Sequence, residues 1–221
     1  SSIQALRSDS LSAWPPARPS LNRPGHPLTQ RCSPSADQIG VPCSRLAELG
    51  SAHPGKNTEV IVAVGPAFGT ELTRTINGLD HEEVLAAILT GVTSQGLVAR
   101  VLKVYRTSDC AAIGYIGAEL SGSGIAIGLQ SRGTTVIHKR GLARLSNLEL
   151  FPQSPSLTLE TYRAIGVNAA RYALGKATTP VPVQVDNWAR LRLIVKTALL
   201  HRHETEQVQD QPPVELRFDW E

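Results

Sequence analysis

Residues 132–135 gather several hydrogen-bonding groups into four positions between a glycine-rich run and a β-branched run. Arg132 offers a guanidinium whose N–H donors form a fixed fork, and Thr134 and Thr135 offer two hydroxyls. The backbone N–H groups beside them add further donors. This set suits a ligand with many amide carbonyls.

Two further places carry groups suited to binding. Asp109 has no second carboxylate beside it, and we expect it to be a hydrogen-bond acceptor at the end of a parallel strand, the edge at which α/β sheets receive ligands. Asn147 lies among apolar residues ahead of Pro152, which stiffens the segment. Such a segment suits a flat hydrophobic ring edged with polar groups, although an ordinary crossover loop has the same pattern.

Known catalytic patterns are not found. Ser123 has no G-x-S-x-G elbow around it, and Glu82 and Glu83 are neighbours at a helix start rather than an acid–base pair. Residues 65–69 follow a strand but have neither G-x-G-x-x-G nor Gly-Lys-Ser/Thr, so they predict a structural turn rather than a nucleotide site. We therefore predict no catalytic residue and no metal ligand in this chain.

His138 begins an H-x-x-G sequence that ends at Gly141. This is half of the D-x-H-x-x-G loop with which one class of cobalamin proteins replaces the lower base of the cofactor by histidine. Val136 stands where the aspartate of that loop belongs, so the carboxylate that would orient the imidazole is missing. We interpret His138 as a structural histidine at a strand end.

The elements that position these residues begin with a continuous β-branched run at 60–64, which is typical of a strand covered on both faces. Residues 81–90 have helical apolar spacing, with Asp80 as the expected cap. Residues 99–105 alternate as a second strand. Strand, helix and strand in this order predict a parallel crossover and hence an α/β sheet.

The rest of the folded part is less regular. Residues 111–116 are a third strand candidate, and 120–138 alternate strand-forming residues with glycines, which indicates extended segments closely approached by another body. Residues 156–174 predict a helix, and 187–200 predict a last helix or a mixture of helix and strand. An acidic tail from residue 201 closes the chain.

Composition divides the 221 residues into two parts. Residues 1–56 hold eight of the fifteen prolines without a sustained apolar period, which predicts a flexible, disordered arm, with at most one helical turn at 44–49. Residues 57–221 then form the folded domain. No apolar run is long enough to span a membrane, and no secretory signal is visible. Three cysteines without metal or disulfide spacing fit a reducing cytoplasm.

Charge is distributed unevenly along the chain. Residues 130–200 carry ten basic against three acidic residues, a net of +7, whereas the tail from 201 has a net of −4. This asymmetry predicts a basic face for phosphate-bearing partners or an acidic neighbouring chain. The alternative is a solvated surface without a partner.

Several segments closely resemble the medium (β) subunit of adenosylcobalamin-dependent propanediol and glycerol dehydratases. The resemblance runs from about residue 58 to about residue 218 and is carried by EVIVAVGPAFG at 59–69, LSGSGI at 120–125, QSRGTTVIH at 130–138, LSNLELFPQ at 145–153, LTLETYR at 157–163 and NAARYA at 168–173. Motifs this long and in this order identify the chain as similar to that family.

The resemblance implies a non-catalytic subunit of a lyase, a hydro-lyase that converts 1,2-diols or glycerol to an aldehyde and water. The expected partners are the large and small dehydratase subunits, as a dimer of heterotrimers, and a reactivating factor is a further expected partner. Adenosylcobalamin (coenzyme B12) is shared with the large subunit, which holds the substrate, a metal ion and the radical chemistry. The implied fold is a three-layer α/β/α domain with a mostly parallel, mixed sheet.

The same resemblance implies a role for each candidate residue. Asp109, Arg132, Thr134 and Arg190 are expected to bond the side-chain amides of the corrin, and the nucleotide-loop pocket is expected to consist of Leu145, Asn147 and Pro152. Arg132 stands where the family usually has lysine, which keeps the charge but changes the contact geometry. The match is thinner around Arg190.

Localisation follows from what the arm lacks. Family members destined for a protein-shelled bacterial microcompartment begin with an amphipathic helix, which residues 1–20 do not show. We therefore expect a cytoplasmic protein, and the alternative is location in such a microcompartment. The sequence contains no methionine, which suggests derivation from a longer polypeptide, such as a fusion with the large subunit.

Two other functions are compatible with parts of the sequence. A nucleic-acid-binding α/β module would use the basic residues of 130–200, although 5% aromatic content argues against base stacking. A small reactivating-factor subunit of the same dehydratase would exchange with the medium subunit and need not hold cobalamin. We expect neither a nucleic acid nor a membrane as a partner.

Overall fold

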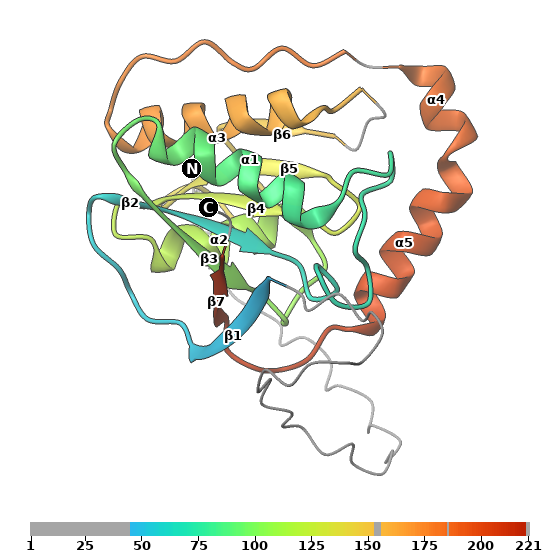
Figure 1. Cartoon of the computed structure of the whole chain (residues 1–221), viewed down its shortest axis with the longest axis horizontal. Helices are drawn as coiled ribbons and strands as arrows, with labels where there is room; N and C mark the ends of the chain where they lie inside the picture. The colour runs from blue at the N-terminus through green and yellow to red at the C-terminus, as the bar shows by residue number, and fades with distance from the viewer. Residues whose placement is uncertain (1–44, 153–155, 185, 220–221) are drawn as a thin grey trace, which may run out of the picture. The chain divides into compact units, whose positions relative to one another are not determined.

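The computed structural model describes residues 45–152, 156–184 and 186–219 (Figure 1). Most of the arm predicted for residues 1–56, together with Cys32 and Cys43, lies outside these ranges. The helices are α1 (His81–Thr93), α2 (Cys110–Leu120), α3 (Leu159–Ala173), α4 (Asn187–Arg192) and α5 (Ile194–Glu206). Among the described helices, none is long and apolar enough to cross a membrane.

A single mixed sheet contains all seven strands of the described residues, in the order β1-β7-β3-β2-β4-β5-β6. The strands are β1 (Leu46–Ser51), β2 (Glu59–Val64), β3 (Val98–Lys103), β4 (Ile125–Leu129), β5 (Thr135–Lys139), β6 (Glu149–Phe151) and β7 (Val214–Phe218). Parallel pairing is confined to β3, β2 and β4, and the outer strands pair antiparallel. The sheet is therefore mixed as predicted, but less parallel, because a link as short as residues 130–134 cannot make a crossover.

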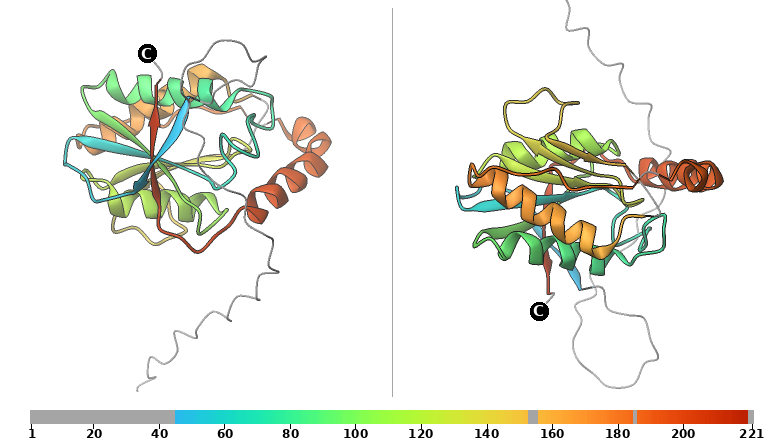
Figure 2. Two further views of the ribbon diagram at one scale, coloured as in Figure 1. Left: turned by 60° about the horizontal axis from the view of Figure 1, so that its bottom comes forward. Right: turned by 90° about the horizontal axis from the view of Figure 1, so that it is seen from above.

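Helices cover both faces of the sheet, which confirms the three-layer α/β/α prediction. Figure 2 shows α1 and α3 on one face and α2 on the other. Val60, Val62 and Val64 of β2 belong to the core with α1 and α3, while Ile61 and Ala63 belong to the core with α2. Alternate side chains of β2 thus enter two cores, which explains its uninterrupted apolar run.

The third strand predicted at 111–116 is wrong, because these residues lie in helix α2. Asp109 caps this helix, and its carboxylate accepts a hydrogen bond from Ala112 N at 2.8 Å. Gly117 lets the helix approach the sheet, since a Cβ there would lie 2.9 Å from Ala63 Cβ. A short apolar run is compatible with a buried helix and with a buried strand. Here the hydrogen bond from Ala112 N to the Asp109 side chain marks the start of a helix.

The two ends of the described chain also differ from expectation. Residues 46–49 of the helical turn expected at 44–49 are instead part of edge strand β1, and the acidic tail contributes β7, which the sequence did not predict. β7 pairs with both β1 and β3, so it joins residues far apart in the sequence. The last predicted element consists of two helices, α4 and α5, without a strand.

Candidate cofactor-binding site

The carboxyl ends of β2 and β4 form the edge of the sheet at which the candidate site lies. Figure 1 shows α5 along the side of the sheet toward which the arrow of β2 points. After β4 the chain makes a tight turn, in which Gln130 N donates to Thr134 O at 2.9 Å and Gly133 N donates to Gln130 O at 2.8 Å. Gly133 adopts a φ of 99°, which favours glycine. The turn brings Arg132 and Thr134 to this edge.

Arg132 is half-buried and only partly paired within the described residues. Its Nε donates to Gln130 Oε1 at 3.0 Å, and Gln130 in turn donates to the carbonyl of Ser108. Among the described residues, no hydrogen bond is made by either Nη group. Burial lowers the pKa of Arg132, and the charges of Glu204 and Asp109 oppose that effect. The guanidinium therefore keeps donors for a ligand beside two carboxylates.

Asp109 is exposed at the start of α2, within electrostatic range of Arg132. One carboxylate oxygen is occupied by the cap to Ala112 N, and the other is available to accept a hydrogen bond from a ligand. The residue is thus a helix cap as well as a candidate ligand-binding group. Any substitution at Asp109 has to separate these two roles.

Thr134 is buried, and its hydroxyl Oγ1 has no hydrogen-bond partner among the described residues. The neighbouring thiol of Cys110 bonds the backbone of Thr134 and not its hydroxyl, since it donates to the Thr134 carbonyl oxygen at 3.2 Å. Burial raises the pKa of that thiol. Buried hydroxyls are rarely left without a partner. The structure therefore brings Asp109, Arg132 and Thr134 together, with one polar atom unsatisfied.

The remaining candidates lie apart from this group. Strand register puts Pro152, which follows Phe151, at the same end of the sheet as Thr135, whereas Leu145 and Asn147 lie in the β5–β6 link at the opposite end. Leu145 is 75% exposed and Asn147 is half-buried. Five strand residues separate the two ends, about 17 Å. A ligand that reached both ends would have to extend along β5 and β6.

Arg190 lies on α4, where its side chain is exposed. Its position in the sequence does not connect Arg190 with the turn after β4. Among the described residues, no hydrogen bond or ion pair of its side chain reaches that turn. The helix that follows α4 does reach the site, through residues that the sequence analysis missed.

Glu204 of α5 is fully buried beneath the turn. Its carboxylate accepts hydrogen bonds from Ser131 N at 3.1 and 3.2 Å and from Ser131 Oγ at 2.8 Å. Burial raises the pKa of Glu204. A Cβ at Gly65 would lie 1.9 Å from the carboxylate oxygen, so the turn predicted at 65–69 needs glycine to admit this side chain.

His81, at the start of α1, supports the same turn from the other side. Its Nε2 donates to Ser131 O at 2.7 Å, because its Nδ1 accepts from Gly69 N at 3.1 Å and therefore carries no proton. The ring stacks on Phe68 with centroids 4.0 Å apart. Burial lowers the pKa of His81 to about 4. The neutral ring thus ties the turn after β2 to the turn after β4.

His201 of α5 is the other residue that the sequence analysis missed. Its Nδ1 is buried without a hydrogen-bond partner in the described residues, and the pKa of the ring is lowered by burial and then by Arg132. The sequence signal that could have identified His201 and Glu204 is their spacing of three residues on a helix whose opposite face is apolar. The predicted helix ended at residue 200, before both of them.

His138 is fully buried in β5, edge-on to Tyr115 with centroids 5.7 Å apart. This position agrees with its interpretation as a structural histidine. Within the described residues, no group of three or more His, Cys, Asp or Glu side chains could hold a metal ion.

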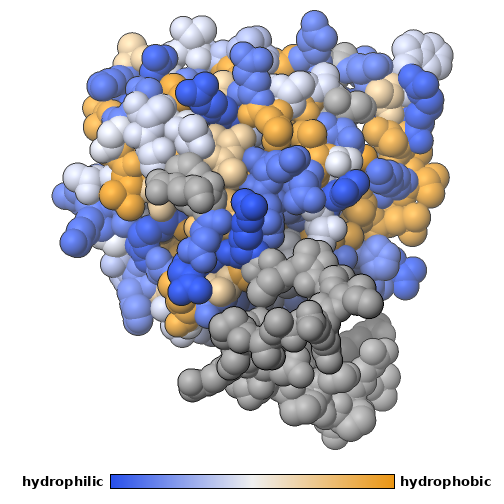
Figure 3. Space-filling view, in the orientation of Figure 1, coloured by the Kyte–Doolittle hydropathy of each residue, from blue (hydrophilic) through white to orange (hydrophobic). Residues whose placement is uncertain are grey.

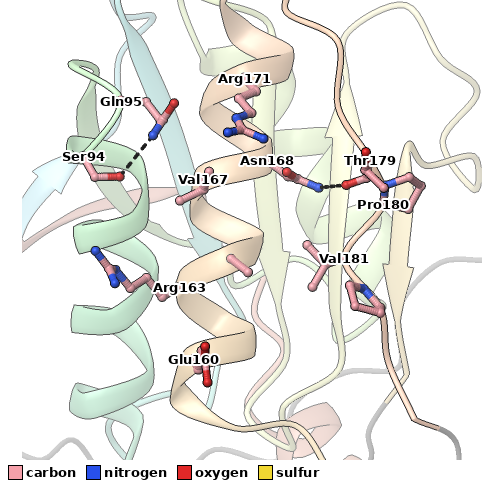
Figure 4. A pocket seen from close by; sticks show the side chains of 12 residues that line it. Ser94, Gln95, Glu160, Arg163, Val167, Asn168, Arg171, Thr179, Pro180 and Val181 are labelled. Atoms are coloured by element: carbon pink, nitrogen blue, oxygen red, sulfur yellow. Dashed lines mark hydrogen bonds between the residues drawn. The ribbon is translucent and has the colours of Figure 1, made fainter.

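A separate cavity of about 650 Å³ lies between α3, the end of α1 and the segment 179–182 (Figure 4). Asn168 donates from Nδ2 to Thr179 O at 2.8 Å and to Glu149 Oε1 at 2.9 Å, which fastens that segment beside β6. Arg163 and Arg171 line the cavity, but the residues of the turn after β4 do not. This cavity is therefore not part of the candidate site.

Comparison with known proteins adds one family and two structures. A family model described as "Dehydratase medium subunit" matches residues 65–179. A solved "Glycerol dehydratase reactivase" is 16% identical with a TM-score of 0.45 and covers 58% of this chain and 100% of its own. A "diol dehydratase-reactivating factor complexed with ADP and Mg2+" is 17% identical with a TM-score of 0.41 and covers 60% of this chain and 100% of its own.

Proposed function

Because the chain belongs to the dehydratase medium subunit family, we propose that it is the cofactor-holding, non-catalytic subunit of a diol or glycerol dehydratase. Such an enzyme converts a 1,2-diol or glycerol to an aldehyde and water. In this proposal adenosylcobalamin lies between this chain and the large subunit, and the catalytic residues belong to the large subunit.

The residues at the carboxyl edge of β2 and β4 fit a corrin edged with amides. Among the described residues, the Nη donors of Arg132 and Oγ1 of Thr134 have no hydrogen-bond partner. The Nη donors suit amide carbonyls, the second carboxylate oxygen of Asp109 suits an amide N–H, and the Thr134 hydroxyl can bond either. Leu145 presents an exposed apolar side chain for the nucleotide loop, with Asn147 in the same β5–β6 link. Pro152 lies at the other end of β6, so a nucleotide loop that contacts all three residues would extend along β5 and β6. Arg190 would join them from α4.

When bound, adenosylcobalamin supplies the radical chemistry of the dehydration. This chain's residues bind and orient the cofactor and, together with the docked large subunit, keep water away from the reactive side. The turn that carries Arg132 and Thr134 is held from below by Glu204 and from the side by His81. These hydrogen bonds preorganise the donors before the cofactor arrives.

The observation that carries the proposal is the family match together with one buried, unsatisfied hydroxyl beside a partly paired arginine. The hydroxyl of Thr134 and the Nη groups of Arg132 lie in a turn of five residues inside the matched region. Most buried polar groups in folded proteins have a hydrogen-bond partner, so two groups without one among the described residues, side by side in one turn, support a ligand there.

The test measures cobalamin retention by the assembled complex, through its visible absorption after gel filtration. We expect Arg132→Ala to weaken cobalamin affinity by about tenfold or more, since a hydrogen bond to a charged group contributes about 1.5–3 kcal/mol. Arg132→Lys keeps the charge and should retain most of the affinity. Asp109→Asn and Asp109→Ser keep the helix cap, so their effect on affinity separates binding from folding.

The other two hypotheses predict different results. A reactivating-factor subunit would exchange with the medium subunit of inactivated enzyme, and the complex containing it would retain no cobalamin. A nucleic-acid-binding module would bind oligonucleotides with an affinity that falls steeply with salt. Cobalamin affinity that is unchanged in both Arg132→Ala and Asp109→Asn would refute the proposed cofactor site.

A further inference from the structure

Helices α4 and α5 turn their large apolar side chains toward solvent. We call the five residues concerned the α4–α5 face: Trp188, Leu191, Ile194, Val195 and Leu199, which are 75%, 61%, 61%, 68% and 50% exposed. Their spacing places them along one side of the two successive helices. Figure 3 shows hydrophobic residues gathered on the right-hand side of the molecule, where Figure 1 places α5.

The inward side of α5 is polar, which is the reverse of an ordinary surface helix. Glu204 is its one fully buried residue among those described, and it is held by Ser131. Lys196 donates from Nζ to Ile76 O at 2.8 Å, and Thr205 Oγ1 lies 2.9 Å from Ser108 Oγ. Polar contacts thus position the helix, while its apolar residues contribute little to the fold of the chain.

The surroundings of the α4–α5 face are basic. Residues 186–206 contain Arg190, Arg192, Lys196 and Arg202 against Asp186, Glu206 and the buried Glu204, so basic residues outnumber acidic ones at the surface. Arg202 pairs with Glu206 one turn later. A matching partner surface is therefore apolar at its centre and acidic around it. A second copy of this chain meeting the same face across a two-fold axis would bring like charges together.

Helix α5 links the α4–α5 face to the proposed cofactor site, because its inward side holds the turn and its outward side carries the face. Glu204 of α5 binds Ser131 in the turn that carries Arg132, and Ile76, whose carbonyl holds Lys196, donates its N–H to Arg132 O at 3.1 Å. The face is therefore one helix diameter, roughly 10 Å, from the turn. A protein that covers Arg132 and Thr134 lies within reach of it.

We propose that the α4–α5 face is the docking surface for the large dehydratase subunit, which meets it with an apolar patch ringed by carboxylates. This inference rests on the proposed function, because it takes the partner to be the protein that shares the cofactor. Trp188 is the expected anchor, since tryptophan in a desolvated pocket dominates many interfaces. Glu204 then has a positioning role, because it fixes the docking helix against the turn that holds the cofactor.

The test measures the affinity of the full chain for purified large subunit by surface plasmon resonance, first without cobalamin. Trp188→Ala is expected to weaken binding by about 30-fold, the factor that corresponds to about 2 kcal/mol. Leu191→Ser should weaken it by about tenfold. Leu174→Ser is the matched control, because Leu174 is also exposed but follows α3 and lies outside the face. Its affinity should stay within about twofold of wild type.

Circular dichroism and the melting temperature show whether each variant is folded, and Val195→Ser replaces any variant that is not. Large-subunit affinity that is equal in Trp188→Ala, Leu191→Ser and the control would overturn the docking surface. Loss of small-subunit binding or of self-association instead would also overturn it.

The cofactor test remains separate from this result. Arg132→Ala should lose cobalamin while keeping large-subunit affinity in the absence of cobalamin. A wild-type complex that retains cobalamin, combined with docking variants that bind the large subunit normally, would refute the docking surface alone. A complex that forms through the α4–α5 face but never retains cobalamin would refute the proposed function alone.

Discussion

The buried imidazole of His81 makes a sharp prediction about stability and pH. The ring is 1% exposed and is kept neutral by burial, which lowers its pKa from 6.5 to about 4. The unfolded chain therefore takes up a proton below pH 6.5 that the folded chain takes up only near pH 4. Stability from this group is fully present at high pH and is lost as the pH falls through this window.

The size of the effect follows from the pKa difference. At about 1.4 kcal/mol for each unit of pKa, the buried ring should cost about 1 kcal/mol of stability at pH 5.5 and about 3 kcal/mol at pH 4, relative to pH 7. His81→Gln keeps an N–H donor for Ser131 O but does not titrate. We expect it to be about 1–2 kcal/mol less stable than wild type at pH 7 and no less stable at pH 4.

Urea unfolding of wild type and His81→Gln at pH 7, 5.5 and 4 measures this difference directly. Subtracting the two curves removes contributions common to both proteins, including the protonation of carboxylates. The control is His203→Gln, because His203 has a largely exposed side chain and its replacement should keep the wild-type pH dependence. A stability difference between wild type and His81→Gln that is constant from pH 7 to pH 4 would refute the reasoning.

Three further substitutions test the packing and the buried charge. Gly166→Ala would place a Cβ 2.2 Å from the carbonyl oxygen of Ile88 between α3 and α1, and it should lower the urea midpoint by an amount equivalent to about 3 kcal/mol. Glu204→Gln should raise stability at pH 8; because burial raises the pKa of the native carboxyl, this gain should shrink as the pH falls through that pKa, as thermal unfolding at several pH values can show. Tyr162→Phe removes a buried hydrogen bond to Gly133 O and should cost about 1–2 kcal/mol in the same urea assay.

The central elements of the fold were predictable from local sequence. The continuous β-branched run of β2 and the capped helical spacing of α1 both appear where expected, because periodicity and capping act over a few residues. Helix α2 was assigned wrongly as a strand, since its short apolar run has no clear period. Asp109 caps this helix, whereas from the sequence we expect only a hydrogen-bond acceptor for a ligand there.

The sequence by itself determined the polar segment 132–135, the helix α3 and the family of the chain. Only the tertiary structure decided that Glu204 and His81 meet at Ser131, and that β7 joins β1 to β3. Sequence patterns report interactions between near neighbours, whereas these contacts join residues 50 or more positions apart. Such contacts depend on how the layers pack. A buried carboxylate or imidazole is costly without a hydrogen bond, and the packing decides which group lies close enough to be its partner.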